Sequence, residues 1–97
     1  MAKQLQSAPG VTIELVHEGD DMHLQRSILA PGAEIPEHAH DVASSYVVVS
    51  GNGYLTGDSG RDLGPGDSVL VAANAKHGWK NSGSDAFHIV GSFVGAH

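Results

Sequence analysis

The sequence predicts an all-β fold for this 97-residue chain. Turn signals built from Gly, Pro, Asn and Asp recur at short intervals, as at Pro31-Gly32 and Gly64-Pro65-Gly66-Asp67. The runs between them are too short for helices, and they are rich in Val, Ile, Leu and aromatic residues, which suit a pleated sheet. No segment shows a convincing helical period. Short strands at regular spacing indicate a sandwich or a barrel.

Five runs have the composition of strands. They are Val11 to His17, His23 to Ala30, Ser45 to Ser50, Ser68 to Ala72 and Phe87 to Val94. The segment Tyr46 to Val49 is continuously apolar, which is typical of a strand covered on both faces. The segment Gly51-Asn52-Gly53 follows it and is interpreted as a hairpin turn.

The length predicts one domain, over residues 11–97, preceded by a flexible segment over residues 1–10. A unit of this size is stable alone only when a large fraction of its apolar surface is buried, so we expect an oligomer. Five Lys and Arg against eleven Asp and Glu give a formal net charge of −6, which repels phosphate backbones and anionic lipids. We therefore expect neither nucleic acid nor a membrane as a partner.

Other compositional features narrow the possible chemistry. The chain has no cysteine, which excludes disulfides, thiolate metal sites and cysteine nucleophiles. The signatures of serine hydrolases, zincins and phosphate-binding loops are absent. No apolar stretch has the length of a signal peptide core or a membrane span, so we expect a cytoplasmic protein.

Three histidines in two separated segments are the strongest functional signal. His38 and His40 are two residues apart, so in an extended strand they point to one face, about 7 Å apart along the chain. His77 must then arrive from a different strand. Neutral imidazoles suit Zn, Fe, Cu and Ni, and three of them leave positions open for water, oxygen or a substrate. The pattern predicts a reactive metal centre with nitrogen and oxygen ligands.

The segment around the first two histidines resembles the first motif of the cupin superfamily, G(x)5HxH(x)3-4E(x)6G. Gly32, His38, His40, Ser44 and Gly51 match every spacing of that motif. Ser44 stands where the family has a glutamate.

The segment around His77 resembles the second cupin motif, G(x)5PxG(x)2H(x)3N. Gly66, Ala72, Asn74, His77 and Asn81 match its spacing, with Ala72 in place of Pro and Asn74 in place of Gly. The second change is mild, because Asn enters the left-handed backbone region more readily than most residues. Asn81 lies in turn sequence, so we expect it to hydrogen-bond the loop.

The resemblance covers nearly the whole chain and implies a small single-domain cupin. It implies a jelly-roll β-barrel, often dimeric, with a metal inside the barrel, and we expect a homodimer. By position, the metal would be held by His38, His40 and His77. We expect one divalent transition metal per chain, with iron first and manganese, nickel, copper or zinc as alternatives. Glu37 and Asp41 are out of phase with the histidines in a regular strand, and Glu34 is in phase but separated from them by Pro36, so we expect a three-histidine site.

Strand alternation predicts the neighbours of the metal. Tyr46 and Ser44 would lie beside His40, and Trp79 would share the face of His77. Tyr46 is the candidate catalytic side chain, and Ser44 and Trp79 are candidate pocket residues. Core packing is the alternative role for Tyr46 and Trp79.

Ser44 also shapes the predicted chemistry, because a neutral group in place of a carboxylate leaves a stronger Lewis acid. A three-histidine ferrous ion keeps three positions free, enough for a bidentate substrate and dioxygen. This favours a dioxygenase acting on a small chelating molecule, and the ligand set resembles that of some cupin dioxygenases. Zinc in the same triad would lower the pKa of bound water to about 7 and support a hydrolase, lyase or isomerase. A non-catalytic module that binds a metal or small ligand is the third alternative.

Overall fold

The computed structural model describes residues 3–58 and 60–95. This part of the chain contains strands and no helix, which confirms the predicted all-β class. The strands are β1 (Lys3–Ala8), β2 (Val11–Glu18), β3 (Met22–Leu29), β4 (Glu34–His38), β5 (Ser44–Ser50), β6 (Gly53–Gly57), β7 (Arg61–Leu63), β8 (Ser68–Val71), β9 (His77–Lys80) and β10 (Phe87–Val94). No helix capable of spanning a membrane is found in the described residues.

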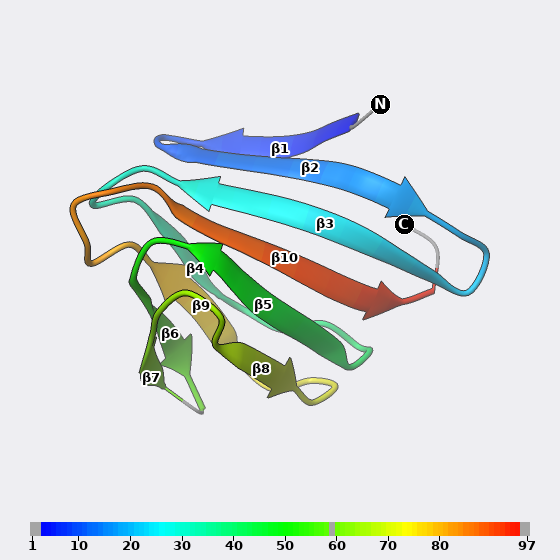
Figure 1. The fold of residues 1–97 in the computed structure, drawn as a ribbon. Coiled ribbons are helices and arrows are strands. Elements are labelled where there is room, and N and C mark those ends of the chain that lie inside the picture. Colours follow the sequence, from blue (N-terminus) through cyan, green and yellow to red (C-terminus); the bar gives the residue numbers. More distant parts are fainter. Residues whose placement is uncertain (1–2, 59, 96–97) are drawn as a thin grey trace.

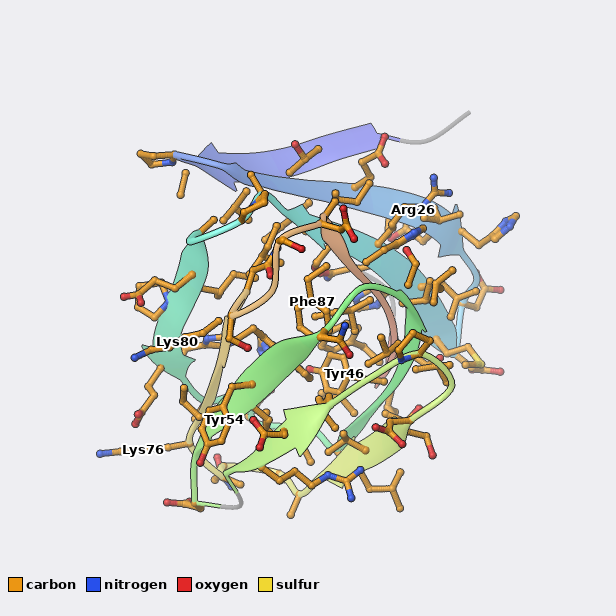
Figure 2. All side chains as sticks on the ribbon, turned by 60° about the vertical axis from the view of Figure 1, so that its left-hand side comes forward. Arg26, Tyr46, Tyr54, Lys76, Lys80 and Phe87 are labelled. Carbon is orange, nitrogen blue, oxygen red and sulfur yellow. The ribbon has the colours of Figure 1, made fainter. Side chains whose placement is uncertain are left out.

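The strands form two antiparallel sheets (Figure 1). The larger sheet has the order β1-β2-β3-β10-β5-β8, and the smaller has the order β4-β9-β6-β7. The hydrophobic core draws side chains from both sheets, including Phe87 and Leu29 from the larger and Leu55 from the smaller. Figure 2 shows Phe87 inside the molecule and Lys76 and Lys80 pointing away from it.

Strand β10 shows most clearly how the sequence makes this core. Phe87, Ile89, Gly91 and Phe93 are buried and alternate with less buried residues, as the two-residue period of a strand requires. The strand lies between β3 and β5 in the larger sheet, so its inward side chains have neighbours from both strands on the same face of the sheet.

The five predicted strands correspond to β2, β3, β5, β8 and β10, which all belong to the larger sheet. Strand β1 was not predicted, although residues 3–8 pair with β2. The predicted flexibility of residues 1–10 and the domain boundary after them stay predictions. Residues 1 and 2 lie outside the described part of the chain.

Two local predictions are wrong. Val47 and Val49 are 48 % and 51 % exposed, so within a single chain β5 is covered on one face only. Gly51-Asn52-Gly53 is not a hairpin turn, because β5 and β6 belong to different sheets and do not pair. This segment instead connects β5 in the larger sheet to β6 in the smaller sheet. Gly51 has a φ of 82°, in the backbone region that favours glycine.

Candidate metal centre

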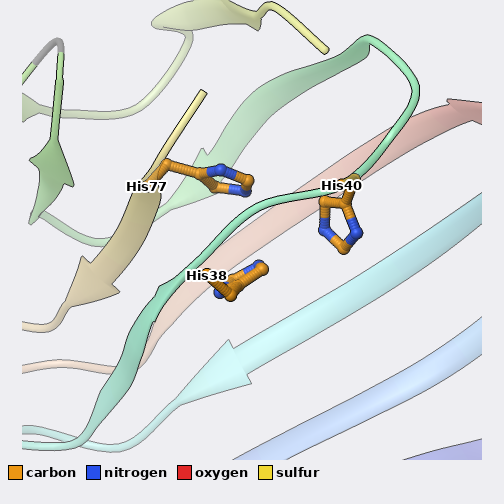
Figure 3. Close-up of side chains that lie close together, drawn as sticks. All are labelled: His38, His40 and His77. Carbon is orange, nitrogen blue, oxygen red and sulfur yellow. The ribbon is translucent and has the colours of Figure 1, made fainter. Parts of the chain in front are cut away.

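The structure brings His38, His40 and His77 together (Figure 3). Each offers one ring nitrogen, and these nitrogens lie within 4.8 Å of one another. The ring centroids are 4.4 to 5.4 Å apart. The three histidines singled out by the sequence therefore share one place in the fold, and they could hold a metal ion.

Two strands of the smaller sheet position this cluster. His38 ends β4, His77 begins β9, and the two residues are partners across the strand pair. His40 follows β4, and its backbone carbonyl accepts a 2.6 Å hydrogen bond from the Asn74 N–H. Asn74 has a φ of 67°, which confirms the left-handed conformation expected from the second motif. This hydrogen bond ties the loop before β9 to the segment that carries His40.

Gly78 permits the close approach of β9 to β4. A Cβ atom at this position would lie 2.7 Å from the Ile35 carbonyl oxygen and 3.0 Å from the Glu37 nitrogen. The contact coincides with a register shift between Ile35 and His38. A larger residue at position 78 would separate the two strands and move His38 away from its partner.

Backbone carbonyls orient two of the imidazoles. His38 Nδ1 lies 2.9 Å from the Pro36 oxygen, and His77 Nδ1 lies 3.3 Å from the Ala75 oxygen. A carbonyl only accepts, so each Nδ1 carries the proton, and each Nε2 presents a lone pair. This is the second-sphere arrangement that fixes the tautomer of a metal-binding histidine, so the donor set fits a transition metal.

The protonation states also suit a metal. Burial lowers the pKa of His40 below its usual value of 6.5, and the neighbouring His38 lowers it further, while Asp41 opposes the shift. Burial also lowers the pKa of His77, with the Ala75 carbonyl opposing. Both rings are therefore neutral at pH 7, which is the form that binds a metal.

A buried hydrogen-bond chain leads to the cluster from β5. The Ser44 hydroxyl donates to the Tyr46 hydroxyl at 2.9 Å, and the latter lies 3.3 Å from His77 Nε2. Because that nitrogen presents a lone pair, Tyr46 is the donor. Burial raises the pKa of Tyr46, with the hydrogen bond from Ser44 opposing, so the phenol stays protonated at neutral pH. The position of the family's glutamate thus holds a neutral hydroxyl that is bonded to Tyr46.

No carboxylate joins the histidine group among the described residues. Glu37 and Asp41 are exposed and line the mouth of the adjoining cavity. Glu34 lies 4.0 Å from Lys80 on the surface. Each of the nearby acids therefore stands apart from the three imidazoles.

The cluster opens into a cavity of about 980 Å³. Trp79 lines it and is also buried in the core, with its ring 4.8 Å from that of Tyr46. The wall contributed by β3 was not anticipated. It presents His23, Gln25 and Ser27 to the cavity. These three residues and the buried Leu29 are spaced two residues apart, so they lie on the same face of the strand. This spacing is the sequence signal that identifies them as inward-facing residues.

Asn81 closes the second motif as a structural residue. It is buried, and its side-chain nitrogen donates to the carbonyls of Leu29 and Asp85 at 2.9 and 2.7 Å. Its side-chain oxygen accepts from the Gly83 N–H at 2.9 Å. These bonds confirm the expected role in holding the loop.

Comparison with known proteins agrees with this architecture. The family model described as cupin domain matches residues 25–93. None of the curated protein sequences matches the chain. An RmlC-like cupin from Shewanella frigidimarina is similar in structure, with a TM-score of 0.85 and 20 % identity over 100 % of this chain and 85 % of that one.

Two further solved structures are similar. The polyketide cyclase RemF from Streptomyces resistomycificus has a TM-score of 0.84 and 16 % identity, over 97 % of this chain and 72 % of that one. KdgF from a Halomonas species has a TM-score of 0.84 and 21 % identity, over 98 % of this chain and 89 % of that one. At these identities the likeness concerns the fold alone, and it confirms the predicted cupin-type barrel.

Proposed function

The chain belongs to the cupin domain family, and we propose that it is a metal-dependent enzyme in which His38, His40 and His77 hold one divalent ion. The observation that carries this proposal is the convergence of three imidazole nitrogens within 4.8 Å, beside a cavity of about 980 Å³ that His38 and His40 line. The cavity is of the size that takes a small molecule. Three protein ligands leave the remaining positions to substrate and solvent.

The reaction we propose is dioxygenation of a small chelating substrate, with iron as the metal. Bound ferrous iron would supply the redox chemistry that joins dioxygen to an organic molecule. The protein's own contribution begins with Tyr46, whose hydroxyl lies 3.3 Å from His77 Nε2 and can donate to a substrate oxygen beside the ion. The Ser44 hydroxyl orients the Tyr46 hydroxyl by donating a hydrogen bond to it. Trp79 and Phe93 give the cavity apolar walls that limit the entry of water.

A Lewis-acid enzyme is the second candidate, with zinc, manganese or nickel in the same triad. The hydrogen-bond chain from Ser44 through Tyr46 favours it, because a protonated phenol beside an ion can give a proton to a leaving group or an enolate. The ligand set is common to both candidates, so the identity of the metal decides between them.

The test is the metal content of purified protein, measured by elemental analysis after loosely bound ions are removed. Wild type is expected to carry about one ion per chain, and His77→Ala is expected to lose it. His17→Ala is the matched control, because His17 is exposed on β2 and lies outside the cluster.

Iron in the protein, with oxygen uptake in the presence of diketones, thiols or catechols, supports the dioxygenase. Zinc, manganese or nickel without oxygen uptake supports the Lewis-acid enzyme. A bound ion with no turnover leaves a non-catalytic binding module. If wild type holds no ion and does not take up any of these metals, the proposal is overturned.

We also propose that the chain forms a homodimer through the outer face of the larger sheet. Val47, Val49 and Leu70 are exposed there, with Leu70 at 84 %. The same face carries Glu14 and Arg26, whose charged groups are 3.7 Å apart. The charges of Glu14 and Arg26 offset each other, which supports contact between two copies despite the formal charge of −6 on each chain. Sedimentation of wild type as a dimer, and of Val47→Glu as a metal-containing monomer, is the expected result, and a monomeric wild type would contradict it.

A further inference from the structure

No lysine or arginine lines the cavity among the residues that the structure describes. Arg26 lies beside Glu14 on the outer face, and the Arg61 guanidinium donates to the Ser68 carbonyl at 2.6 Å. Figure 2 shows Lys76 and Lys80 directed away from the labelled Tyr46. The mouth of the cavity instead carries the acids Glu37 and Asp41. Apart from a bound ion, the described walls therefore carry no permanently charged lysine or arginine that could compensate an anion.

The wall formed by β3 supplies a hydrogen-bond acceptor. His23 Nδ1 donates to the Gly95 carbonyl at 2.8 Å, because a carbonyl oxygen only accepts. The Gln25 amide nitrogen lies 3.1 Å from the Nε2 of the same ring and, as an amide nitrogen, is the donor. The ring of His23 is also stacked on Phe93, with centroids 5.0 Å apart and planes 8° from parallel. These contacts engage one N–H of the Gln25 amide, and its oxygen is the acceptor that this side chain can offer to a ligand in the cavity.

The two walls of the cavity have different chemistry. His38 and His40 line it from the end of β4 and the segment that follows, and Gln25 and Ser27 line it from β3 in the larger sheet. A ligand bound to the histidine side must therefore extend toward a neutral, oxygen-bearing surface. A carboxylate or phosphate placed there would face the Gln25 oxygen without a cation, whereas a hydroxyl or N–H would donate to it.

We propose that the cavity selects a small ligand that chelates at one end and carries an uncharged hydrogen-bond donor at the other, which it places on Gln25 and Ser27. This inference rests on the proposed function, because the chelating end needs the ion. The ligand class is a neutral hydroxylated or N–H-bearing molecule, and acidic or phosphorylated analogues are disfavoured. Gln25 is the specificity-determining residue.

The test uses two probes with the same chelating end. One is 4-(hydroxymethyl)catechol and the other is 3,4-dihydroxybenzoate, and both are titrated calorimetrically into zinc-loaded protein. The alcohol is expected to bind about tenfold more tightly than the carboxylate, an effect of the size of one hydrogen bond to a partly buried polar group. Gln25→Leu is expected to remove this preference.

Two further variants sharpen the result. Gln25→Lys adds a cation to the wall and is expected to reverse the preference toward the carboxylate. Ser27→Ala is expected to weaken the alcohol only, and Ser45→Ala, on a residue that does not line the cavity, is the matched control. Zinc content and thermal unfolding are measured for each variant, so that a folding defect is recognised.

The outcomes separate this inference from the proposed function. Protein that binds zinc and catechol but does not prefer the alcohol, or keeps that preference in Gln25→Leu, overturns the inference and leaves the metal site intact. Protein that binds neither zinc nor catechol overturns both.

Discussion

Replacing Tyr46 by Phe is expected to weaken the metal-free fold and to tighten metal binding. In the structure the Tyr46 hydroxyl donates to His77 Nε2, the same lone pair that an ion would use. Wild type must break this hydrogen bond before the ion can bind. Tyr46→Phe has no such bond to break, so the competition is removed.

The size of both effects follows from the hydrogen-bond chain. A neutral hydrogen bond contributes about 0.5–1.5 kcal/mol net, so its loss as a competitor should raise metal affinity about two- to tenfold. The metal-free variant loses two hydrogen bonds and leaves the Ser44 hydroxyl, which is 5 % exposed, without its partner. We expect the free energy of unfolding to fall by about 1–3 kcal/mol.

Zinc affinity is measured by competition with a chromophoric chelator, and stability by urea unfolding with and without excess zinc. Ser44→Ala is the matched control. It removes the bond to Tyr46 and leaves the contact between Tyr46 and His77 in place, so its zinc affinity should stay close to that of wild type. Weaker zinc binding by Tyr46→Phe would refute the reasoning, because the hydroxyl would then support the bound ion rather than compete with it.

Ser44→Glu should lower the melting temperature of the metal-free protein, because an unpaired buried carboxylate costs several kcal/mol. Added zinc should raise the melting temperature of this variant by more than it raises that of wild type. Equal zinc-induced shifts in the two proteins would show that the new carboxylate does not reach the ion. Gly91→Ala should lower the free energy of unfolding in urea by about 1–3 kcal/mol, since the added Cβ would lie 2.8 Å from the Tyr46 ring, and wild-type stability would contradict this packing. In an NMR titration His88 should show a pKa below 6.5, because burial and then the charge of Arg26 lower it. Below pH 6.5 the unfolded chain takes up a proton on His88 more readily than the folded chain does, so the free energy of unfolding should fall as the pH drops through this range. Arg26→Met should move the pKa of His88 back toward 6.5.

The sequence identified the cluster better than the sheet that carries it. The motif spacing was sufficient to select His38, His40 and His77, because the pairing of β4 with β9 brings them together. Their grouping does not depend on the details of side-chain packing. The strands of the smaller sheet have three to five residues, too few to establish an alternation. Strand β9, with the sequence HGWK, also contains a glycine that strand propensity disfavours, although the approach of β4 requires it.

Strand β3 was located correctly, yet hydrophobicity alone would turn it the wrong way. Its sequence, MHLQRSIL, places Met22 and Leu24 in the phase opposite to His23 and Gln25. In the structure Met22 is exposed and His23 is buried, because the inner face borders a polar cavity. The rule that apolar residues face inward applies to a filled core, whereas the inward residues of β3 line a cavity.

This reversal connects the cavity with the proposed dimer. A strand has two faces, so polar residues turned toward a ligand leave the apolar residues of β3 on the outer surface of the larger sheet. That surface continues into β5, where Val47 and Val49 are exposed. A second copy that covers this surface would bury its apolar side chains. This burial would offset the apolar contacts that the small domain lacks along its cavity. Loss of the dimer is therefore expected to lower stability without changing ligand preference, whereas Gln25→Leu is expected to change ligand preference in a protein that remains dimeric.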